Sequence, residues 1–449
     1  MQTRIDPGIF KSYDIRGIYP SELNEAVAES IGRAFVTYLG VDRVAIGRDM
    51  RSSSASLFEA FARGANEAGA DAIDLGLTST DELYFAVGKF GYPAGAMITA
   101  SHNPKEYNGF KLCREGAIPL SAETGVFAIR DLVVEGRFAK SGRKGTIEKR
   151  DVLPAFVDHC LSFVDRSAIR PLKVAIDCGN GMGGLIVPAI FKQLPVEVIP
   201  LFFDLDGTFP NHPASPIEPE NMVDVQSAVR AHHADLGAAF DGDADRVFIT
   251  DERGNLVGGD MVTALVADML LRTHPGATVL YNLICSRGVP EIISARGGAP
   301  VRTRVGHSII KAVMRERNAI FGGEHSGHFY FRDHYYADSG LIALLLVLEL
   351  VSRENKPLSE LLAPLDRRFR SGEINSKVED AGAKIAQVAA AYSDADQIDY
   401  LDGVTIQYGD WWCNIRPSNT EPLLRLNVEA DDPALLAQKR DELLTLIRR

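Results

Sequence analysis

Val174-Ala-Ile-Asp-Cys-Gly-Asn-Gly181 decides the fold, because it joins a β-branched strand directly to a turn rich in glycine and asparagine. A helical stretch follows, and a second strand returns at Val196-Glu-Val-Ile-Pro200. A strand, a helix and a second strand in this order predict parallel pairing, since the helix carries the chain back to the start of the sheet. The segment therefore predicts an α/β domain.

The same plan occurs in two further places. One unit runs from Val44-Ala-Ile-Gly-Arg-Asp49 through a helix-like stretch, Ser54 to Ala68, to a strand at Asp71-Ala-Ile-Asp-Leu-Gly76. Another starts at Val279-Leu-Tyr-Asn282 and returns at Pro300-Val-Arg-Thr-Arg304. Their uneven spacing indicates divergent, domain-sized repeats and not a solenoid. We expect three similar mixed α/β domains with largely parallel sheets.

The pattern changes after about Arg367. Three strand-like pieces follow, at Glu373 to Val378, Gly403 to Tyr408 and Leu423 to Val428, and then a closing amphipathic helix from Pro433 to Arg448. This texture predicts a separate, smaller α+β domain. The chain is thus expected to form four domains around a central cleft, at residues 1–148, 149–252, 253–367 and 368–449.

Composition limits the classes of function. The 449 residues are 46% hydrophobic and 24% charged, and their net charge of −12 disfavours binding to nucleic acid or an anionic membrane. Five scattered cysteines contain no C-x-x-C pair, which is typical of reduced thiols. The start of the chain lacks the apolar stretch of a signal peptide, and the most apolar run, Leu341 to Leu348, is about half a membrane span. We expect a cytoplasmic protein.

The densest chemical signal is the loop Phe240-Asp-Gly-Asp-Ala-Asp-Arg-Val-Phe248. Its carboxylates at Asp241, Asp243 and Asp245 alternate between two apolar strands and repel one another unless a cation lies among them. An EF-hand is excluded because Arg246 stands where that loop needs glycine. A solvated acidic turn is the remaining alternative. The position at a strand end favours a site for a hard divalent cation.

A second signal is Met97-Ile-Thr-Ala-Ser-His-Asn-Pro104, in which a strand stops near Ser101. The serine suits a phosphoryl acceptor, although taken alone it reads better as a hydroxyl that caps a turn. Lys111 follows the next turn and could neutralise phosphoryl charge or transfer a proton. An ordinary surface lysine is the alternative.

Two further segments carry polar groups. Arg304-Val-Gly-His-Ser308 and Gly322-Gly-Glu-His-Ser-Gly-His328 offer donors and acceptors that suit sugar hydroxyls. Their histidines match no zinc spacing, and each could be an ordinary core or turn histidine. Asn414-Ile-Arg-Pro-Ser-Asn-Thr-Glu-Pro422, with Arg425 beyond it, makes a phosphate nest or a polar hairpin loop. Tyr13-Asp-Ile-Arg-Gly17 adds an arginine near the N-terminus.

No dinucleotide fingerprint or P-loop occurs in the sequence. What remains is a serine, a divalent-metal loop, a polyol-binding loop and a separate phosphate nest, one in each expected domain. A reaction that needs all four would move phosphoryl groups on a sugar phosphate.

In this order and spacing, the strings T-A-S-H-N-P, D-G-D-A-D-R, G-E-H-S-G-H and R-P-S-N-T-E-P closely resemble the α-D-phosphohexomutases, above all the bacterial phosphomannomutase/phosphoglucomutase group. The resemblance covers essentially the whole chain. It implies an isomerase that moves a phosphoryl group between C1 and C6 of hexose phosphates. The implied route is a phosphoserine and a hexose 1,6-bisphosphate, which serves as intermediate and activator, with Mg²⁺ as the metal.

The resemblance also implies residue roles. The phosphorylated residue would be Ser101, which with Asp241, Asp243 and Asp245 would hold Mg²⁺. Positive residues around the phosphoryl group would be Arg16, Lys111 and Arg246. Sugar hydroxyls would bind Glu324 and Ser326. The distal phosphate would bind Arg416, Ser418, Asn419 and Thr420, and we add Arg425 to this clamp. Tyr13, His307 and His328 would line the cleft, to which we add Arg304.

One departure concerns charge in the cleft. Close relatives carry a lysine where this chain has Ile284, so Arg304 or Arg287 is expected to compensate. We expect action on both mannose and glucose phosphates, since ligands of other ring hydroxyls discriminate weakly at C2. Alternatives are a phosphoglucosamine mutase, whose members tend to carry glutamine at the position of His325, or a non-catalytic sugar-phosphate-binding homologue. The expected state is a monomer or homodimer.

Overall fold

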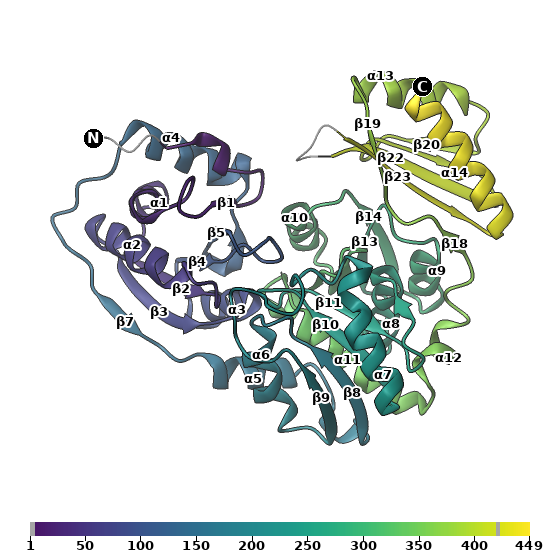
Figure 1. The fold of residues 1–449 in the computed structure, drawn as a ribbon, viewed down its shortest axis with the longest axis horizontal. Coiled ribbons are helices and arrows are strands. Elements are labelled where there is room, and N and C mark those ends of the chain that lie inside the picture. Colours follow the sequence, from purple (N-terminus) through teal and green to yellow (C-terminus); the bar gives the residue numbers. More distant parts are fainter. Residues whose placement is uncertain (1–4, 419–422) are drawn as a thin grey trace.

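The computed structural model describes residues 5–418 and 423–449. Among these residues the strands form four sheets, which follow one another along the chain (Figure 1). The first three sheets mix parallel and antiparallel strands, and the fourth is antiparallel. The predicted fold class, three mixed α/β domains and a smaller C-terminal α+β domain, is confirmed.

The first sheet has the order β1-β5-β4-β2-β3-β7, with β6 paired to β5. Its strands β4, β2, β3 and β7 are parallel, because α2 and α3 return the chain across the sheet. The strands are β1 (Ile15–Ile18), β2 (Arg43–Arg48), β3 (Asp71–Leu77), β4 (Ala94–Ile98), β5 (Tyr107–Arg114), β6 (Ile118–Pro119) and β7 (Ile147–Lys149). The helices are α1 (Glu25–Leu39), α2 (Ser54–Glu67), α3 (Thr80–Phe90) and α4 (Phe127–Glu135).

The second sheet has the order β12-β11-β10-β8-β9, and its strands β10, β8 and β9 are parallel. The strands are β8 (Leu172–Asp177), β9 (Val196–Leu201), β10 (Leu236–Phe240), β11 (Val247–Thr250) and β12 (Leu256–Val257). The helices are α5 (Leu153–Leu161), α6 (Gly183–Phe191) and α7 (Val223–His232). Since β12 pairs with β11, strand pairing in this sheet continues beyond residue 252, where we predicted the boundary. The three predicted boundaries remain predictions.

The third sheet has the order β14-β13-β15-β16-β17, with β14, β13 and β15 parallel. The strands are β13 (Thr278–Asn282), β14 (Ala299–Thr303), β15 (Phe321–Gly323), β16 (Phe329–Phe331) and β17 (Ala337–Asp338). The helices are α8 (Gly259–Leu271), α9 (Gly288–Ala295), α10 (His307–Arg317), α11 (Gly340–Glu354) and α12 (Leu358–Leu362).

The fourth sheet has the order β18-β23-β22-β21-β20, with β19 paired to β23. Its strands are β18 (Phe369–Arg370), β19 (Ile374–Lys377), β20 (Gln397–Asp399), β21 (Val404–Gln407), β22 (Trp411–Pro417) and β23 (Leu423–Ala430). The helices are α13 (Ala381–Ala391) and α14 (Pro433–Arg448). Sequence reasoning identified β19, β21, β23 and α14, but not β22 or α13.

The three α/β sheets share one plan that positions the candidate site. In each sheet, the strand at one edge of the parallel group is followed in the chain by an antiparallel neighbour. The resulting hairpins are β4–β5, β10–β11 and β15–β16. The hairpin loops contain Ser101, the three aspartates of the acidic loop, and Glu324 to His328. Sequence segments far apart in the chain therefore occupy equivalent places in the repeated domains.

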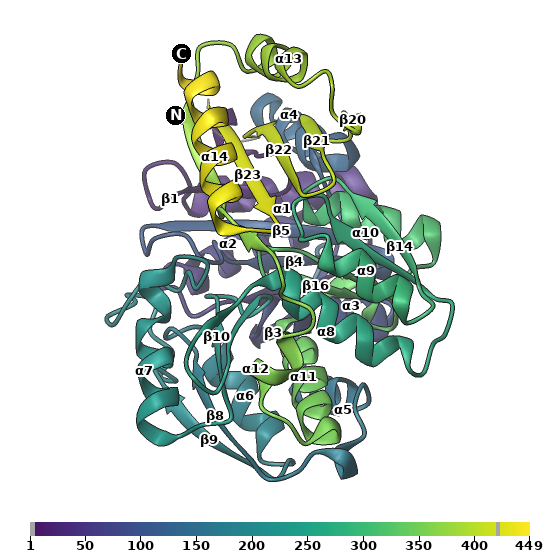
Figure 2. The same cartoon turned by 90° about the vertical axis from the view of Figure 1, so that its right-hand side faces the viewer.

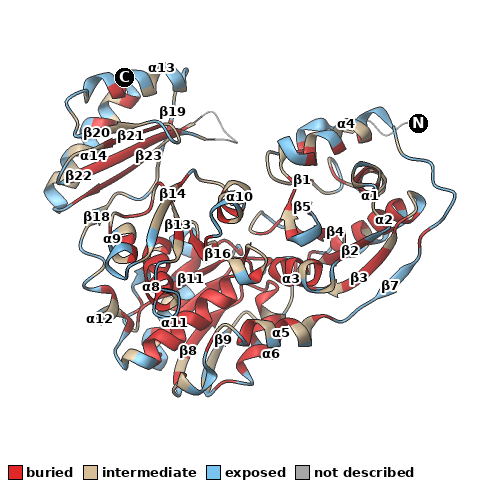
Figure 3. Ribbon diagram, turned by 180° about the vertical axis from the view of Figure 1, so that it is seen from behind, coloured by how far each residue is buried: buried red, intermediate tan, exposed pale blue. Residues whose placement is uncertain are grey.

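The second and third domains share one continuous hydrophobic core. The helices α8 and α11 are buried almost throughout, as Figure 3 shows in red. The apolar run that resembled half a membrane span is thus core packing within α11. Within residues 5–418 and 423–449, no helix has both the length and the apolar character needed to cross a membrane. The fourth domain has a core of its own and, in the view of Figure 2, lies above the second domain.

Candidate active site

Ser101 lies in the β4–β5 hairpin loop with its backbone in the left-handed region, at φ 51°. Its N–H donates to the Thr99 hydroxyl at 2.8 Å. The guanidinium of Arg51, which is 2% exposed, donates to the Ser101 and Asn103 carbonyls, both at 2.7 Å, and to two further carbonyls of the loop. These contacts offset a backbone strain on the order of 1–3 kcal/mol. The loop thus holds the serine in one fixed position.

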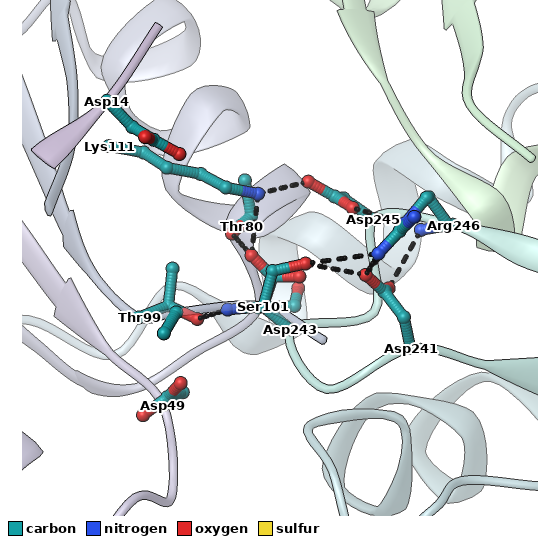
Figure 4. A network of polar contacts seen from close by, with 12 residues as sticks. Asp14, Asp49, Thr80, Thr99, Ser101, Lys111, Asp241, Asp243, Asp245 and Arg246 are labelled. Atoms are coloured by element: carbon teal, nitrogen blue, oxygen red, sulfur yellow. Dashed lines mark hydrogen bonds and ion pairs between the residues drawn. The ribbon is translucent and has the colours of Figure 1, made fainter. Parts of the chain in front are cut away.

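The acidic loop of the second domain approaches this serine at Gly242. A Cβ there would lie 2.4 Å from the Ser101 carbonyl oxygen, so the close approach requires glycine. The Ser101 hydroxyl donates to Asp241 at 2.8 Å, and Arg246 donates to the same hydroxyl at 3.4 Å (Figure 4). Arg246 also donates through Nε to Asp241 at 2.9 Å. A hydroxyl, a carboxylate and a guanidinium therefore meet at one point.

The three aspartates form a compact group of buried oxygens. Asp241, Asp243 and Asp245 each offer one ligand atom, and these atoms lie within 4.8 Å of one another. Burial raises the pKa of Asp241 to about 6, although Arg246 opposes this effect. The Oδ1 atoms of Asp243 and Asp245 are buried and accept no hydrogen bond from the described residues. Unpaired carboxylate oxygens in this arrangement suit a divalent metal ion.

Lys111 of the first domain contacts the same loop. Its Nζ donates to Asp243 at 2.7 Å and to Asp245 at 2.5 Å, and Thr80 donates to Asp243 at 2.6 Å. Burial favours neutral Asp243, but Lys111 and Thr80 outweigh it and hold the pKa of that carboxyl well below its usual range. In the same way, the carboxylates outweigh burial and raise the pKa of Lys111. The site therefore contains a fixed ammonium beside the serine.

His328 lies at the end of the third hairpin loop. Its Nδ1 bonds to Asp338 at 2.7 Å, and the other Asp338 oxygen forms an ion pair with Lys311 at 2.6 Å. Burial lowers the pKa of His328, but the hydrogen bond to Asp338 outweighs burial and the pKa is raised. Lys311 is 1% exposed, and its ammonium lies 4.2 Å from the centroid of the Tyr84 ring. The chain Lys311–Asp338–His328 fixes the orientation of the imidazole.

One small cavity, of about 50 Å³, collects these groups from three domains. Its volume is well below the roughly 300–1,000 Å³ of pockets that enclose drug-sized ligands, so a sugar ring would extend outside it. The residues predicted from the sequence that line it are Arg16, Ser101, Lys111, Asp245, Arg246, His307 and His328. The residues that sequence reasoning did not single out are Tyr84, His102, Lys311 and Asp338. The cavity thus suits a group about the size of a phosphoryl.

Arg16 and Tyr13 come from the N-terminal segment. Arg16 donates to Asp14 at 2.7 Å and to the Ala100 carbonyl at 3.3 Å. The Tyr13 ring meets the His307 ring edge-on, with centroids 5.2 Å apart. The first domain thereby contacts α10 of the third domain beside the cavity.

Glu324 lies on the candidate sugar loop and is bonded within the third domain. Its side chain is buried and accepts a hydrogen bond from the Tyr330 hydroxyl. Burial raises the pKa of Tyr13, and Glu324 adds to this rise. Burial lowers the pKa of Arg416, an effect that Glu324 opposes. Ser326, on the same loop, is half-buried.

The candidate clamp lies in the fourth domain on β22 and β23. Arg416 is 3% exposed and donates to Glu373 at 2.6 Å, and Arg425 lies 3.3 Å from the same carboxylate. Arg425 also donates to the Ser418 hydroxyl at 3.2 Å. The predicted residues Asn419 and Thr420 lie outside the described residues.

Arg287 and Arg304, which we expected to replace the missing lysine, lie outside the cavity around Ser101. The guanidinium of Arg287 donates to the Tyr408 carbonyl at 2.7 Å and to two nearby carbonyls of the fourth domain. Arg304 is exposed and acts on Tyr13, whose pKa it lowers against the effect of burial. The cavity is lined by neither of them. It contains the ammonium of Lys311 instead.

Sequence reasoning overlooked Lys311, Asp338, Arg51 and Glu373. Lys311 follows His307 by one helical turn on α10, and this spacing places both on the same face, so the pattern could have identified it. The other three lack a local signal, because their partners are distant in the sequence.

Comparison with known families gives four matches in sequence order. The models described as phosphoglucomutase/phosphomannomutase alpha/beta/alpha domains I, II and III match residues 7–140, 154–254 and 258–368. The model of the phosphoglucomutase/phosphomannomutase C-terminal domain matches residues 373–446. Together these matches cover most of the chain.

Whole-chain relatives agree with these matches. A protein named phosphohexose mutases from Xanthomonas campestris pv. campestris is 44% identical over 98% of this chain and 99% of its own length. A phosphomannomutase from Escherichia coli is 42% identical, again over 98% of this chain and 99% of its own. The crystal structure of a phosphoglucomutase/phosphomannomutase family protein from Burkholderia thailandensis superposes with a TM-score of 0.91 at 35% identity, covering 99% of this chain and 97% of that one.

Proposed function

Because this chain belongs to the phosphoglucomutase/phosphomannomutase family and is a phosphohexomutase, an isomerase of hexose phosphates, we propose that it works through a phosphorylated Ser101. The position of the Ser101 hydroxyl, 2.8 Å from Asp241 and 3.4 Å from Arg246, is the observation that carries this proposal. A buried hydroxyl beside a cation site and two fixed cations suits reversible phosphoryl transfer. An intact site of this kind disfavours the non-catalytic alternative.

The first half-reaction transfers the phosphoryl group to the sugar. The free sugar hydroxyl attacks phosphorus, its proton passes to the second nitrogen of His328, and the bond between phosphorus and Ser101 Oγ breaks. Arg246 stabilises the charge on Oγ, while Lys111 neutralises the phosphoryl oxygens. The product is a hexose 1,6-bisphosphate.

The second half-reaction restores the enzyme. After the bisphosphate has turned around, Ser101 Oγ attacks the other phosphorus and the bond from that phosphorus to the sugar oxygen breaks. The sugar oxygen takes back the proton from His328, so no proton or electron pair is gained or lost over the cycle. The two half-reactions are mirror images, which is why a single serine serves both.

Mg²⁺ is the proposed metal, held by Asp241, Asp243, Asp245 and the phosphorylated Ser101. When bound, it supplies Lewis-acid stabilisation of charge on the phosphoryl oxygens. Lys111 already bonds to two of these carboxylates, so it can hold the loop in place while the phosphoryl group is transferred.

Substrate binding uses the remaining predicted residues. Glu324 and Ser326 would hold ring hydroxyls, while Arg416, Ser418, Asn419, Thr420 and Arg425 would hold the phosphate that is not reacting. Tyr13, Arg304 and His307 would line the path between them. Arg16 would contribute positive charge beside the phosphoryl group. Such a clamp lets the sugar bind in both orientations.

The proposed substrates are mannose and glucose phosphates, with hexose 1,6-bisphosphate as activator and intermediate. Two relatives named phosphomannomutase or phosphohexose mutases support this choice. Glucosamine phosphate is the alternative within the same chemistry, and His325 is the position that would distinguish it.

Mass spectrometry and a coupled assay test the proposal. We expect one phosphate on Ser101, and turnover of mannose 1-phosphate and glucose 1-phosphate above that of glucosamine 1-phosphate. Ser101→Ala should lower kcat at least about 10³-fold, because the acceptor of the phosphoryl group is gone. Ser141→Ala, on an exposed loop, is the control. A phosphate-free Ser101, or a Ser101→Ala variant as active as the parent, would refute the mechanism.

A further inference from the structure

Glu373 contacts both arginines of the candidate clamp. It stands just before β19, at the edge of the fourth sheet, and its carboxylate accepts from Arg416 at 2.6 Å and lies 3.3 Å from Arg425. Its side chain is 26% exposed, so one part of the carboxylate faces solvent. A carboxylate thus sits among the donors that are expected to hold phosphate.

The strand register explains why an anion is needed there. Arg416 on β22 and Arg425 on β23 are direct cross-strand partners. Like charges directly opposite one another destabilise a sheet, so the two guanidiniums repel each other. The pKa of Arg416 is lowered by burial and further by Arg425, while Glu373 opposes both effects. The carboxylate therefore neutralises a pair of guanidiniums that would otherwise repel.

A phosphate monoester makes the same contacts. Arginine guanidiniums bind carboxylate and phosphate through the same planar pairs of N–H donors. When the substrate's phosphate reaches Arg416 and Arg425, it must displace Glu373 or lie beside it. Either outcome costs free energy, because the two anions compete for one set of donors or repel each other.

We propose that Glu373 is an internal competitor of the substrate's phosphate, which keeps the clamp from holding the bisphosphate intermediate too tightly. The inference rests on the proposed function, in which each turnover requires the clamp to release one phosphate and bind the other. As phosphate leaves, Glu373 replaces it on the arginines, so the pair is never left without a counter-charge. Glu373 therefore lowers the affinity of the clamp for phosphate, and the two phosphates of the intermediate exchange faster as a result.

Glu373→Gln separates charge from position. The amide has nearly the same shape and still offers Arg416 an acceptor oxygen, but it carries no charge. We expect KM for mannose 1-phosphate to fall about 3–10-fold and kcat to fall as well, because the intermediate turns around more slowly. Calorimetry should give a Kd for mannose 6-phosphate that falls by the same factor. The gain should shrink at high salt, since it is electrostatic.

Glu442→Gln is the matched control, because Glu442 is a carboxylate of the same domain that pairs with Lys439 on α14, away from the clamp. It should leave KM, kcat and Kd at parent values. A Kd for Glu373→Gln that equals or exceeds the parent's would overturn the inference and leave Glu373 as a residue that only positions Arg416. The calorimetric result does not depend on turnover. An inactive parent would therefore contradict the proposed function alone, and the Kd would still decide the role of Glu373.

Discussion

The first three domains are joined by fully buried polar contacts, whereas the polar contacts between the third and fourth domains are partly buried or exposed. Ser339, at the start of α11 in the third domain, donates to Asp81 of the first at 2.7 Å, and both are fully buried. Arg368, before the fourth sheet, pairs with Glu291 on α9, whose side chain is 60% exposed. The same chain thus uses two kinds of attachment.

The difference predicts which part moves. Separating a buried hydrogen-bonded group leaves it unpaired, at a cost of about 1–3 kcal/mol, whereas an exposed ion pair contributes roughly 0–1 kcal/mol. The cavity around Ser101 is therefore preassembled, and the fourth domain is the part that can close over a substrate. We predict a hinge motion of this domain, visible as compaction in small-angle scattering when saturating substrate is added.

Among changes that leave Ser101 intact, the largest effect should come from removing the proposed metal, because three clustered carboxylates lie beside the serine. Chelation should lower kcat about 10²-fold or more, and added Mg²⁺ should restore it. Asp243→Asn should have an effect of similar size, since it removes a ligand and one partner of Lys111. Steady-state kinetics after dialysis against chelator would measure both.

Two controls apply to the metal prediction. Ca²⁺ should restore activity poorly, because it prefers longer bonds and more ligands than Mg²⁺ does. Asp206→Asn, at an exposed turn of the same domain, should leave kcat unchanged. Full activity in chelator would show that the aspartates have a structural role only.

The next effect concerns the clamp of the fourth domain. Arg416→Lys keeps the charge but loses the planar fork, so KM for hexose 1-phosphates should rise about 10-fold while kcat stays within a few-fold. The phosphate content of Ser101, measured by mass spectrometry, should not change. Arg440→Lys, at an exposed position on α14, is the control. A fall in kcat with an unchanged KM would place Arg416 in the chemical step and contradict the division between the two regions.

Sequence reasoning recovered the regions where the pattern is local. Each α/β unit, such as Val174 to Pro200, is recognisable in the sequence as a strand, a turn and a returning strand. The parallel pairing predicted for the two strands of each unit is confirmed. The acidic loop and the loop of Ser101 were recognisable because each is a short string at a strand end. That the structure brings them together follows from the repeated hairpin position, which the sequence pattern did not reveal.

What the sequence could not predict depends on long-range contacts. Arg51 and Glu373 look like ordinary charged residues before a helix and before a strand, and only the packing of distant elements gives them the carbonyls of the Ser101 loop and the clamp arginines as partners. The strand β22 was missed because it continues the polar string that was interpreted as a loop. Its register is what places Arg416 opposite Arg425.

A smaller effect is expected where the fourth domain is attached. Arg287→Ala removes donors to three carbonyls of that domain, so the domain should sample more open positions and KM should rise about 2–5-fold. The radius of gyration without substrate should increase slightly. Arg296→Ala, an exposed neighbour at the end of α9, is the control. A loss of kcat without change in KM would mean that Arg287 supplies charge to the reaction, as the comparison with Ile284 suggested.

The smallest effect on activity, and the clearest on stability, should come from the buried contact between the first and third domains. Burial raises the pKa of Asp81 to about 8, although Ser79 and Ser339 donate to it and oppose the rise. In the unfolded chain an aspartate titrates near 3.9, so between about pH 4 and pH 8 the folded protein binds a proton that the unfolded chain has released. Stability is therefore lost as pH rises through this window, by up to about 1.4 kcal/mol per pH unit, and the loss is complete above pH 8.

Asp81→Asn removes this titration while keeping a hydrogen-bonding side chain of the same size. The difference in melting temperature between the variant and the parent should therefore grow in favour of the variant from pH 5 to pH 8 and then level off, with kcat near the parent value. Asp441→Asn, on the exposed surface of α14, should show a constant difference over the same range, because its pKa is lowered by Arg440 and it stays ionised. Glu82 contributes in the same direction, since burial raises its pKa to about 7, so the Asp81→Asn variant should itself still lose stability as pH rises, over a lower range. A difference that stays flat from pH 5 to pH 9 would mean that Asp81 is ionised in the folded protein, and that the first and third domains are joined by a charged contact after all.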